Sequence, residues 1–200
     1  MNKIKLSGTI IGEPTYSHKA RREKMYEVYV GVKRKTDTVD ILFCIVPEVL
    51  LNGINDGDKV SFIGEIRTRN VTDGNKKRLQ VYVFVKETDE YIGHDDQTVE
   101  IEGYICKEPL YRETPLGREI TDVLIASNRE HNFQSDYIPC IAWGRNARRA
   151  SCMNVSCAIS ATGRLQSRQY VKRLEDGTEE IRTAYELSLN TMEVADESNN

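Results

Sequence analysis

Several features that mark enzymes, membrane proteins or metal proteins are missing from this sequence. No apolar run approaches the roughly 20 residues of a membrane-spanning helix, and the first residues, MNKIKLSGTI, lack the apolar stretch of a signal peptide. The five cysteines form no CxxC pair, and the three histidines are scattered. No phosphate-binding loop and no His/Cys/Asp constellation is present. We therefore expect a cytosolic, non-enzymatic protein with reduced thiols and without metal or cofactor.

The composition is that of an ordinary globular protein. Of the 200 residues, 39% are hydrophobic and 30% are charged, which suits one large or two small domains. The formal net charge is −3. This acidic balance argues against a surface that is basic throughout, but it permits a basic groove on an acidic body.

The chain contains two copies of one unit. Residues 4–16, IKLSGTIIGEPTY, align with residues 99–111, VEIEGYICKEPLY, at an offset of 95. Three further pairs of segments match in the same order: 27–34 with 122–129, 40–46 with 136–142, and 64–70 with 163–170. The acidic and polar stretch 87–97 separates the copies. We predict two domains, 1–91 and 97–194, followed by a short polar tail, 195–200.

Each copy is predicted to form five strands and one short helix. Val28, Val30 and Val32 alternate with other residues, which is the period of two that strands require. The expected strands are 2–12, 24–34, 38–46, 58–70 and 77–88 in the first copy, and 97–107, 119–129, 135–143, 155–171 and 178–193 in the second. Asp-Gly pairs at 73–74 and 176–177 predict hairpin tips. The expected helices are Pro47–Leu51 and Arg145–Cys152.

This order of elements predicts the all-β fold class, with two tandem OB-folds. An OB-fold is a five-stranded Greek-key barrel, here with a short helix between strands three and four, and it often binds oligonucleotides or oligosaccharides. An SH3-like barrel also has five strands, but its helix placement and strand lengths fit this sequence less well.

The stretch 136–149, DYIPCIAWGRNARR, is typical of a strand, a glycine turn and the start of a helix. Ile138 and its alternate neighbours form a small apolar face that suits a core. The opposite face carries Tyr137 and ends in Trp143, the single tryptophan, which three arginines follow closely. Aromatic rings edged with guanidinium groups are typical of sites that hold unpaired bases. The alternative is that both aromatics are ordinary half-buried strand residues.

The second copy resembles the bacterial single-stranded DNA-binding proteins across nearly all of residues 97–194. The matching motifs occur in the family's order: EPLYRETPLG at 108–117, ASNR at 126–129, SDYIPCIAWG at 135–144 and GRLQSR at 163–168. The resemblance implies an OB-fold that binds unpaired DNA without sequence preference in replication, recombination and repair.

The resemblance also implies which residues contact DNA. The family's stacking aromatics lie at both ends of strand three, after strand two and on the long strand four. In this sequence those positions hold Tyr137 and Trp143, His131 or Phe133, and Tyr170. Arginine forks onto phosphate and stacks on bases, so nearby arginines complete the expected site. The predicted DNA-contacting residues are Tyr137, Trp143, Tyr170, Arg164, Arg168, Arg145, Arg129, Phe133, Arg112, Arg67, Arg69 and Lys33.

The first copy resembles the family more weakly. By our alignment, Ile41, Pro47 and Asn70 stand where the second copy has Tyr137, Trp143 and Tyr170. What it retains is positive charge. We predict that this copy tracks the phosphate backbone or is structural, with little stacking.

The resemblance carries expectations about assembly. Family members with one OB-fold form tetramers, so two chains of this two-barrel protein would restore four barrels. The apolar first strands, Ile4–Ile11 and Val99–Ile105, also offer sheet edges that a homodimer would cover. The alternative is a monomer in which the two copies cover each other's edges. The sequence ends in EVADESNN, not in the family's long tail with an acidic tip, so recruitment of replication or repair proteins through that tip is in doubt.

Two other functions fit parts of the sequence. A pair of OB-folds that has lost DNA binding could scaffold a replication or phage complex; the acidic net charge favours this, and the retained Trp143 and Tyr170 oppose it. RNA is an alternative ligand, because stacking groups do not read the 2′-hydroxyl.

Overall fold

The computed structural model describes residues 1–73, 76–130, 134–174 and 177–195. The first half of the chain forms strands with one short 3-10 helix between the third and the fourth. They are β1 (Asn2–Ala20), β2 (Glu23–Lys33), β3 (Val39–Pro47), η1 (Glu48–Leu50), β4 (Lys59–Asp73) and β5 (Lys76–Asp89). These bounds agree with the predicted strands, except that β1 continues beyond residue 12 and forms a long hairpin with β2.

The second half repeats this order, with the equivalent of β1 divided into two strands, β6 and β7. Its elements are β6 (Asp96–Ile105), β7 (Leu110–Glu113), β8 (Glu119–Asn128), β9 (Ser135–Trp143), α1 (Arg145–Ser151), β10 (Ala158–Arg173) and β11 (Glu179–Val194). β7 pairs with β8 at the edge of the sheet, as the far part of β1 pairs with β2. The predicted helices are found as η1 and α1, and the glycines of both predicted hairpin tips lie in or beside the undescribed residues 74–75 and 175–176.

Each half closes into a barrel. In the first half, β1 pairs with both β2 and β4, and the ring is completed by the β2–β3, β3–β5 and β4–β5 pairs. In the second half, β6 takes the place of β1 and pairs with β8 and β10. Alternate residues of each strand point inward and form the core, as Val28, Val30 and Val32 do on β2. The predicted OB-fold is therefore confirmed.

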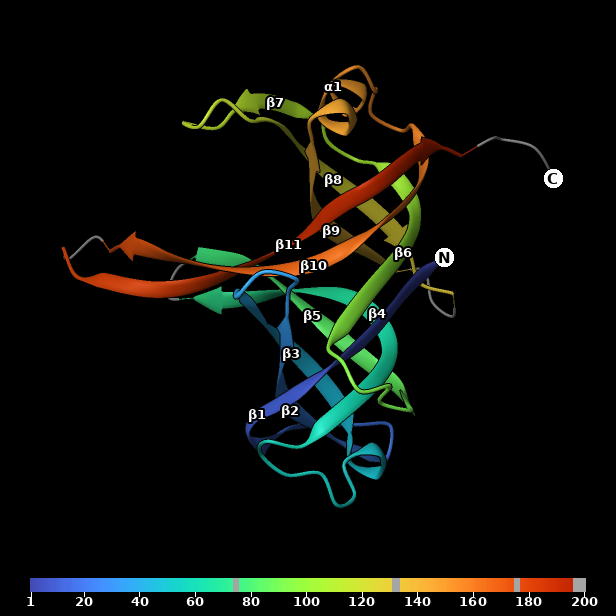
Figure 1. The fold of residues 1–200 in the computed structure, drawn as a ribbon, viewed down its shortest axis with the longest axis vertical. Helices are drawn as coiled ribbons and strands as arrows, with labels where there is room; N and C mark the ends of the chain where they lie inside the picture. Colours follow the sequence, from blue (N-terminus) through green and yellow to red (C-terminus); the bar gives the residue numbers. More distant parts are fainter. Residues whose placement is uncertain (74–75, 131–133, 175–176, 196–200) are drawn as a thin grey trace.

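The two barrels are joined through their first strands. β1 and β6 pair antiparallel, so that one 11-stranded sheet runs through both halves (Figure 1). Ile4 lies directly opposite Val99. These two residues are equivalent in the two copies, so the local two-fold axis that relates the halves passes through this pair.

This junction corrects one part of the assembly prediction. The apolar edges of β1 and β6 are already covered within the chain, as in the monomer alternative. Edge protection therefore gives no reason for two chains to associate. The barrel-count reason for a homodimer is unaffected.

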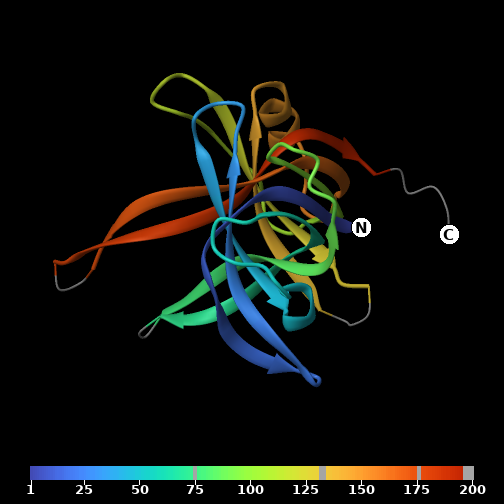
Figure 2. The same cartoon turned by 60° about the horizontal axis from the view of Figure 1, so that its bottom comes forward.

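The long hairpins project from the barrels. β10–β11 and β4–β5 extend to the same side of the molecule, and the β1–β2 hairpin points in another direction (Figure 2). Equivalent β-bulges before Gly64 and Gly163 shape the β4–β5 and β10–β11 hairpins. A Cβ at Gly163 would lie 2.3 Å from the carbonyl oxygen of Ser188, which explains why both copies hold glycine here. Among the described residues, none of the helices has the length and apolar character needed to cross a membrane.

Candidate nucleic-acid interface

The outer face of β9 presents two of the predicted aromatics. Ile138 and Cys140 are buried, so their neighbour Tyr137 is directed outward, and 47% of its surface is exposed. Trp143, at the end of the strand, is partly buried, and its Nε1 donates a hydrogen bond to Ser188 Oγ at 3.1 Å. The predicted alternation thus holds from Asp136 to Cys140, whereas Ile141 is buried and Trp143 packs across onto β11.

Tyr170 lies on the same surface. It borders a cavity of about 250 Å³ together with Pro139, which shares the outer face of β9 with Tyr137. The guanidinium of Arg168 lies 6.0 Å from the centre of the Tyr170 ring, at the limit of a cation–π contact. The opposite wall of this cavity is residues 78–81 of β5. The tyrosine on the long β10 hairpin therefore reaches across to the first half of the chain.

Tyr185 is a neighbour that the sequence did not single out. It lines the same cavity and packs against the first-half cluster of Met25, Phe43 and Ile45. Burial raises the pKa of its hydroxyl far above the ordinary value. From the sequence, Tyr185 cannot be told from a residue of the barrel core. Its place between the two halves is seen only in the fold.

Two predicted DNA contacts, Arg129 and Arg164, form ion pairs inside the protein. Arg129 donates to both oxygens of the buried Asp136 at 2.8 and 2.7 Å. Arg164 donates to Asp40 Oδ2 at 3.1 Å, and Arg34 binds the same carboxylate. These guanidinium groups serve the fold, so we do not propose them as principal DNA contacts.

The two aspartates also connect the halves in the same way. Asp136 accepts a hydrogen bond from the backbone N–H of Thr68 at 2.6 Å, and Asp40 accepts one from the N–H of Ser167 at 2.9 Å. The hydroxyls of Thr68 and Ser167 in turn accept from the N–H groups of Tyr137 and Ile41, both at 2.9 Å. The contact that fixes the β9 aromatic face therefore comes from β4 of the other half.

The other predicted contacts are placed in several ways. Arg145 is exposed at the start of α1, and Arg112 is half-exposed with a two-pronged bond to Asp122. Lys33 lies at the surface near Asp37. Phe133, with His131, lies outside the described residues.

The first half has its own aromatic surface. Tyr82 and Phe84 lie on the outer face of β5, and Phe43 packs between Tyr29 and Tyr82, with ring centres 5.5 and 6.4 Å away. The guanidinium of Arg67 lies 3.7 Å from the centre of the Phe84 ring. The predicted lack of stacking considered only the aligned positions, none of which is in this cluster.

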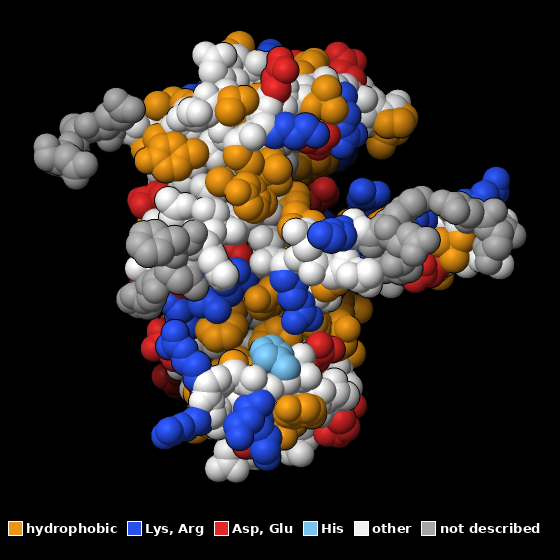
Figure 3. Space-filling view, turned by 180° about the vertical axis from the view of Figure 1, so that it is seen from behind, with side chains coloured by type: hydrophobic (Ala, Val, Ile, Leu, Met, Phe, Trp, Pro, Cys, Tyr) orange, Lys and Arg blue, Asp and Glu red, His pale blue; other side chains and the backbone are white. Residues whose placement is uncertain are grey.

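The charge on the molecule is unevenly distributed. Seen from behind, lysine and arginine side chains gather on the lower part, over the first-half barrel (Figure 3). This basic surface lies on a chain whose net charge is −3. Such a surface attracts anionic ligands, and oligonucleotides are among them.

The paired barrels, the aromatic face and the basic surface define an OB-fold nucleic-acid-binding protein. The model of the Single-strand binding protein family matches residues 96–195, half of the chain. The chain belongs to this family, and single-stranded DNA is its ligand. A search of curated proteins finds no match.

Solved structures share the whole two-barrel arrangement. The wild-type single-stranded DNA-binding protein of Thermus aquaticus superposes with a TM-score of 0.79 at 16% identity, covering 100% of this chain and 95% of its own. A deletion mutant of that protein gives a TM-score of 0.77 at 16% identity, covering 100% and 97%. The similarity extends over the first half as well, which the family model does not match, and at this identity it shows the fold.

Proposed function

We propose that the second half of the chain provides the principal binding face for single-stranded DNA, and that it binds without sequence preference. The observation that supports this most is that Pro139 and Tyr170 line one cavity, while the exposed Tyr137 shares the outer face of β9 with Pro139. Each ring can stack a base, and stacking tolerates any base because all four have a π-face. Arg168 and Arg145 are both exposed and in this proposal contact phosphates.

Trp143 has a partly different role in this proposal. Its indole N–H is held by Ser188, which fixes the ring plane at the end of β9. The ring is partly exposed, so one edge or face is open to a base. A fixed ring stacks with little loss of side-chain entropy, which favours affinity.

The proposal extends to assembly and setting. Two chains would supply four barrels, the number found in tetramers of one-barrel family members, so we propose a homodimer. We place it in the cytoplasm, acting on DNA that replication or repair has unpaired. Light scattering at micromolar concentration tests the dimer; a mass that stays near the 22.9 kDa of one chain, with and without DNA, would exclude it.

Titration with oligo-dT tests the binding mode, because Trp143 is the single tryptophan and reports from the proposed face. We expect saturable quenching that weakens with salt, with a log–log slope near −0.7 for each phosphate neutralised. Oligo-dA and oligo-dC should bind with comparable affinity, and oligo-U shows whether RNA competes. Absence of quenching with every oligonucleotide at low salt would contradict the proposed face.

A further inference from the structure

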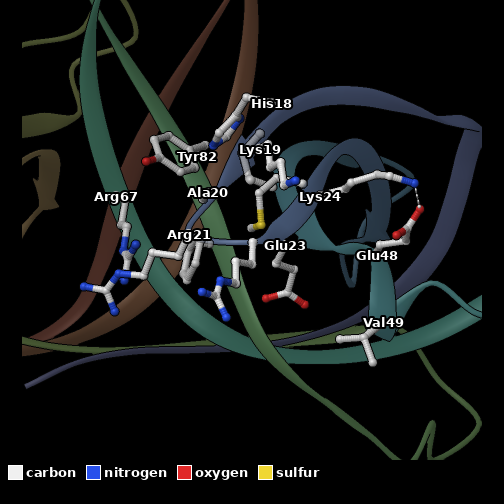
Figure 4. A pocket seen from close by; sticks show the side chains of 14 residues that line it. His18, Lys19, Ala20, Arg21, Glu23, Lys24, Glu48, Val49, Arg67 and Tyr82 are labelled. Carbon is white, nitrogen blue, oxygen red and sulfur yellow. Dashed lines mark hydrogen bonds and ion pairs between the residues drawn. The ribbon is translucent and has the colours of Figure 1, made fainter.

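A hollow of about 1000 Å³ lies in the first half, between the β1–β2 hairpin, the end of β3 and the outer faces of β4 and β5 (Figure 4). This volume is at the upper end of the range of small-molecule sites, ~300–1,000 Å³, so it suits an extended ligand. Five cationic side chains line it against two carboxylates. They are Lys19, Arg21, Arg22, Lys24 and Arg67, with Glu23 and Glu48.

Carboxylates neutralise part of this charge, since Arg67 donates to Glu65 Oε2 at 2.9 Å. Glu48 is occupied by Lys24, whose Nζ lies 2.9 Å from its Oε1, and Figure 4 shows this pair at the end of the hollow away from Arg67. Among the described residues, Arg21 and Arg22 take part in no salt bridge. The hairpin end of the hollow therefore keeps a net positive charge, because Lys19, Arg21 and Arg22 outnumber Glu23 there, and it fits an anionic ligand.

The backbone at the hairpin tip carries these arginines against local preference. Ala20 pairs with Glu23, so Arg21 and Arg22 form a two-residue turn. Their φ angles are 54° and 153°, a region that glycine and asparagine adopt far more readily than arginine. Residues held in such conformations cluster at binding sites, where the side chain serves a purpose other than stability.

Aromatic rings complete the site on the β5 side. Phe84 and Tyr82 both line the hollow, and Arg67 stacks on Phe84. A guanidinium plane on a ring offers a second flat surface to an incoming base, because arginine stacks on bases as aromatics do. A peptide carboxylate would use the charge alone and leave these flat surfaces unused.

A comparison of the halves shows why an aromatic is found here. The β3–β5 and β9–β11 pairs have the same register, so Phe84 is the equivalent of Ser188. In the second half, Trp143 reaches across from β9 and packs on that serine. In the first half, β3 has Pro47 at the tryptophan position and β5 has Phe84 at the serine position. A large ring is therefore present in both halves, supplied by β9 in the second half and by β5 in the first.

We propose that the first half holds a second site for single-stranded DNA, in which Phe84, with Arg67 stacked on it, and Tyr82 offer flat surfaces to bases, and Arg21 and Arg22 hold phosphates. It rests on the proposed function, since the ligand is the same. It differs in using β5 aromatics and a hairpin tip in place of the strand-three and strand-four aromatics of the second half.

Two single-tryptophan proteins test the site. The wild type reports from Trp143, and a Trp143→Phe/Phe84→Trp double variant reports from the hollow. We expect oligo-dT to quench both. The matched control is Trp143→Phe/Tyr16→Trp, because Tyr16 is in the same half, is 59% exposed and does not line the hollow. This reporter should show little quenching. Quenching of the wild type but not of the Phe84→Trp reporter would overturn the inference and leave the proposed function intact; quenching of neither would overturn the proposed function.

A second variant keeps the test decisive if the reporters fold poorly. An Arg21→Gly/Arg22→Gly double variant places the residue that the turn prefers at both positions, so its melting temperature should be equal or higher. Its affinity for long oligo-dT should fall at least about five-fold, and the salt slope should lose about 1.4, for two phosphates. Unchanged affinity and slope in a folded variant would refute a DNA-binding role for the hairpin.

Discussion

An Arg129→Ala substitution removes two hydrogen bonds from a carboxylate that solvent hardly reaches. The side chain of Asp136 is 1% exposed, and Arg129 lies at 2.7 and 2.8 Å from its two oxygens. After the substitution, the N–H and hydroxyl of Thr68 remain as donors to this charge. Breaking a buried pair in this way typically costs about 3–5 kcal/mol. We expect a loss of this size in the free energy of unfolding, measured by urea denaturation.

Arg112 supplies a matched control. It binds Asp122 with the same two-pronged geometry, at 2.8 and 3.1 Å, but the two side chains are 50% and 39% exposed. Exposed ion pairs contribute about 0.2–1 kcal/mol, so Arg112→Ala should cost less than a third of what Arg129→Ala costs. Equal losses for the two variants would refute the view that burial of Asp136 makes its ion pair structural.

A double variant separates the buried charge from the lost contact. Arg129→Ala/Asp136→Asn removes the uncompensated charge and keeps an acceptor for the Thr68 N–H. It should therefore recover part of the stability that Arg129→Ala loses. A double variant less stable than the single one would show that Asp136 matters for reasons other than its charge.

Three further outcomes are expected. Trp143→Ala and Tyr170→Ala should each weaken oligo-dT binding by about 1–3 kcal/mol in a fluorescence-anisotropy titration; a change below two-fold for both would exclude stacking at these rings. Burial opposes ionisation of Glu65, but its bonds to Lys86 and Arg67 outweigh this and lower the pKa of Glu65. Its stabilising effect is thus full above about pH 4.5 and lost below, so the stability gap to Glu65→Gln should close on acidification. Gly163→Ala should destabilise the fold by about 1–3 kcal/mol in urea, since its Cβ would meet a β11 carbonyl.

The strands and barrels followed from local patterns. The period of two in Val28–Val32, and the same order of segments in both copies, required no knowledge of tertiary contacts. The junction could not be obtained in this way. An apolar strand such as Ile4–Ile11 gives the same signal whether its partner is the other copy or another chain, because pairing depends on the geometry of the linker.

The structural arginines left a signal that a search for repeats can find. Arg34 and Asp40 recur as Arg129 and Asp136, whereas the aromatics differ between the copies. A charged pair present in both copies, beside ligand-binding positions that changed, indicates a role in the shared fold. Arg164 was predicted as a DNA contact without knowledge of the neighbouring barrel, whose Asp40 binds it.

The aligned positions missed the Phe84 ring for a geometric reason. A groove between two parallel strands is filled by side chains from both, so a large residue on one strand and a small one on the other can exchange places. Trp143 with Ser188, and Pro47 with Phe84, are the two arrangements of such a pair. Position-by-position comparison records the change at Pro47 as a loss, because the gain lies on a strand that is distant in sequence. The register of β3–β5 and β9–β11 restores the correspondence.

The β1–β4 and β6–β10 registers give the equivalent of Tyr170. Gly64 lies opposite Ile4 and Gly163 lies opposite Val99, so the two glycines are equivalent. Counting onward from them pairs Tyr170 with Val71, one residue from the aligned Asn70. The first half therefore lacks an equivalent of the Tyr170 ring, while Phe84 on β5 takes the place of the Trp143 ring. DNA binding by the first half should depend on Phe84 as that of the second half depends on Trp143.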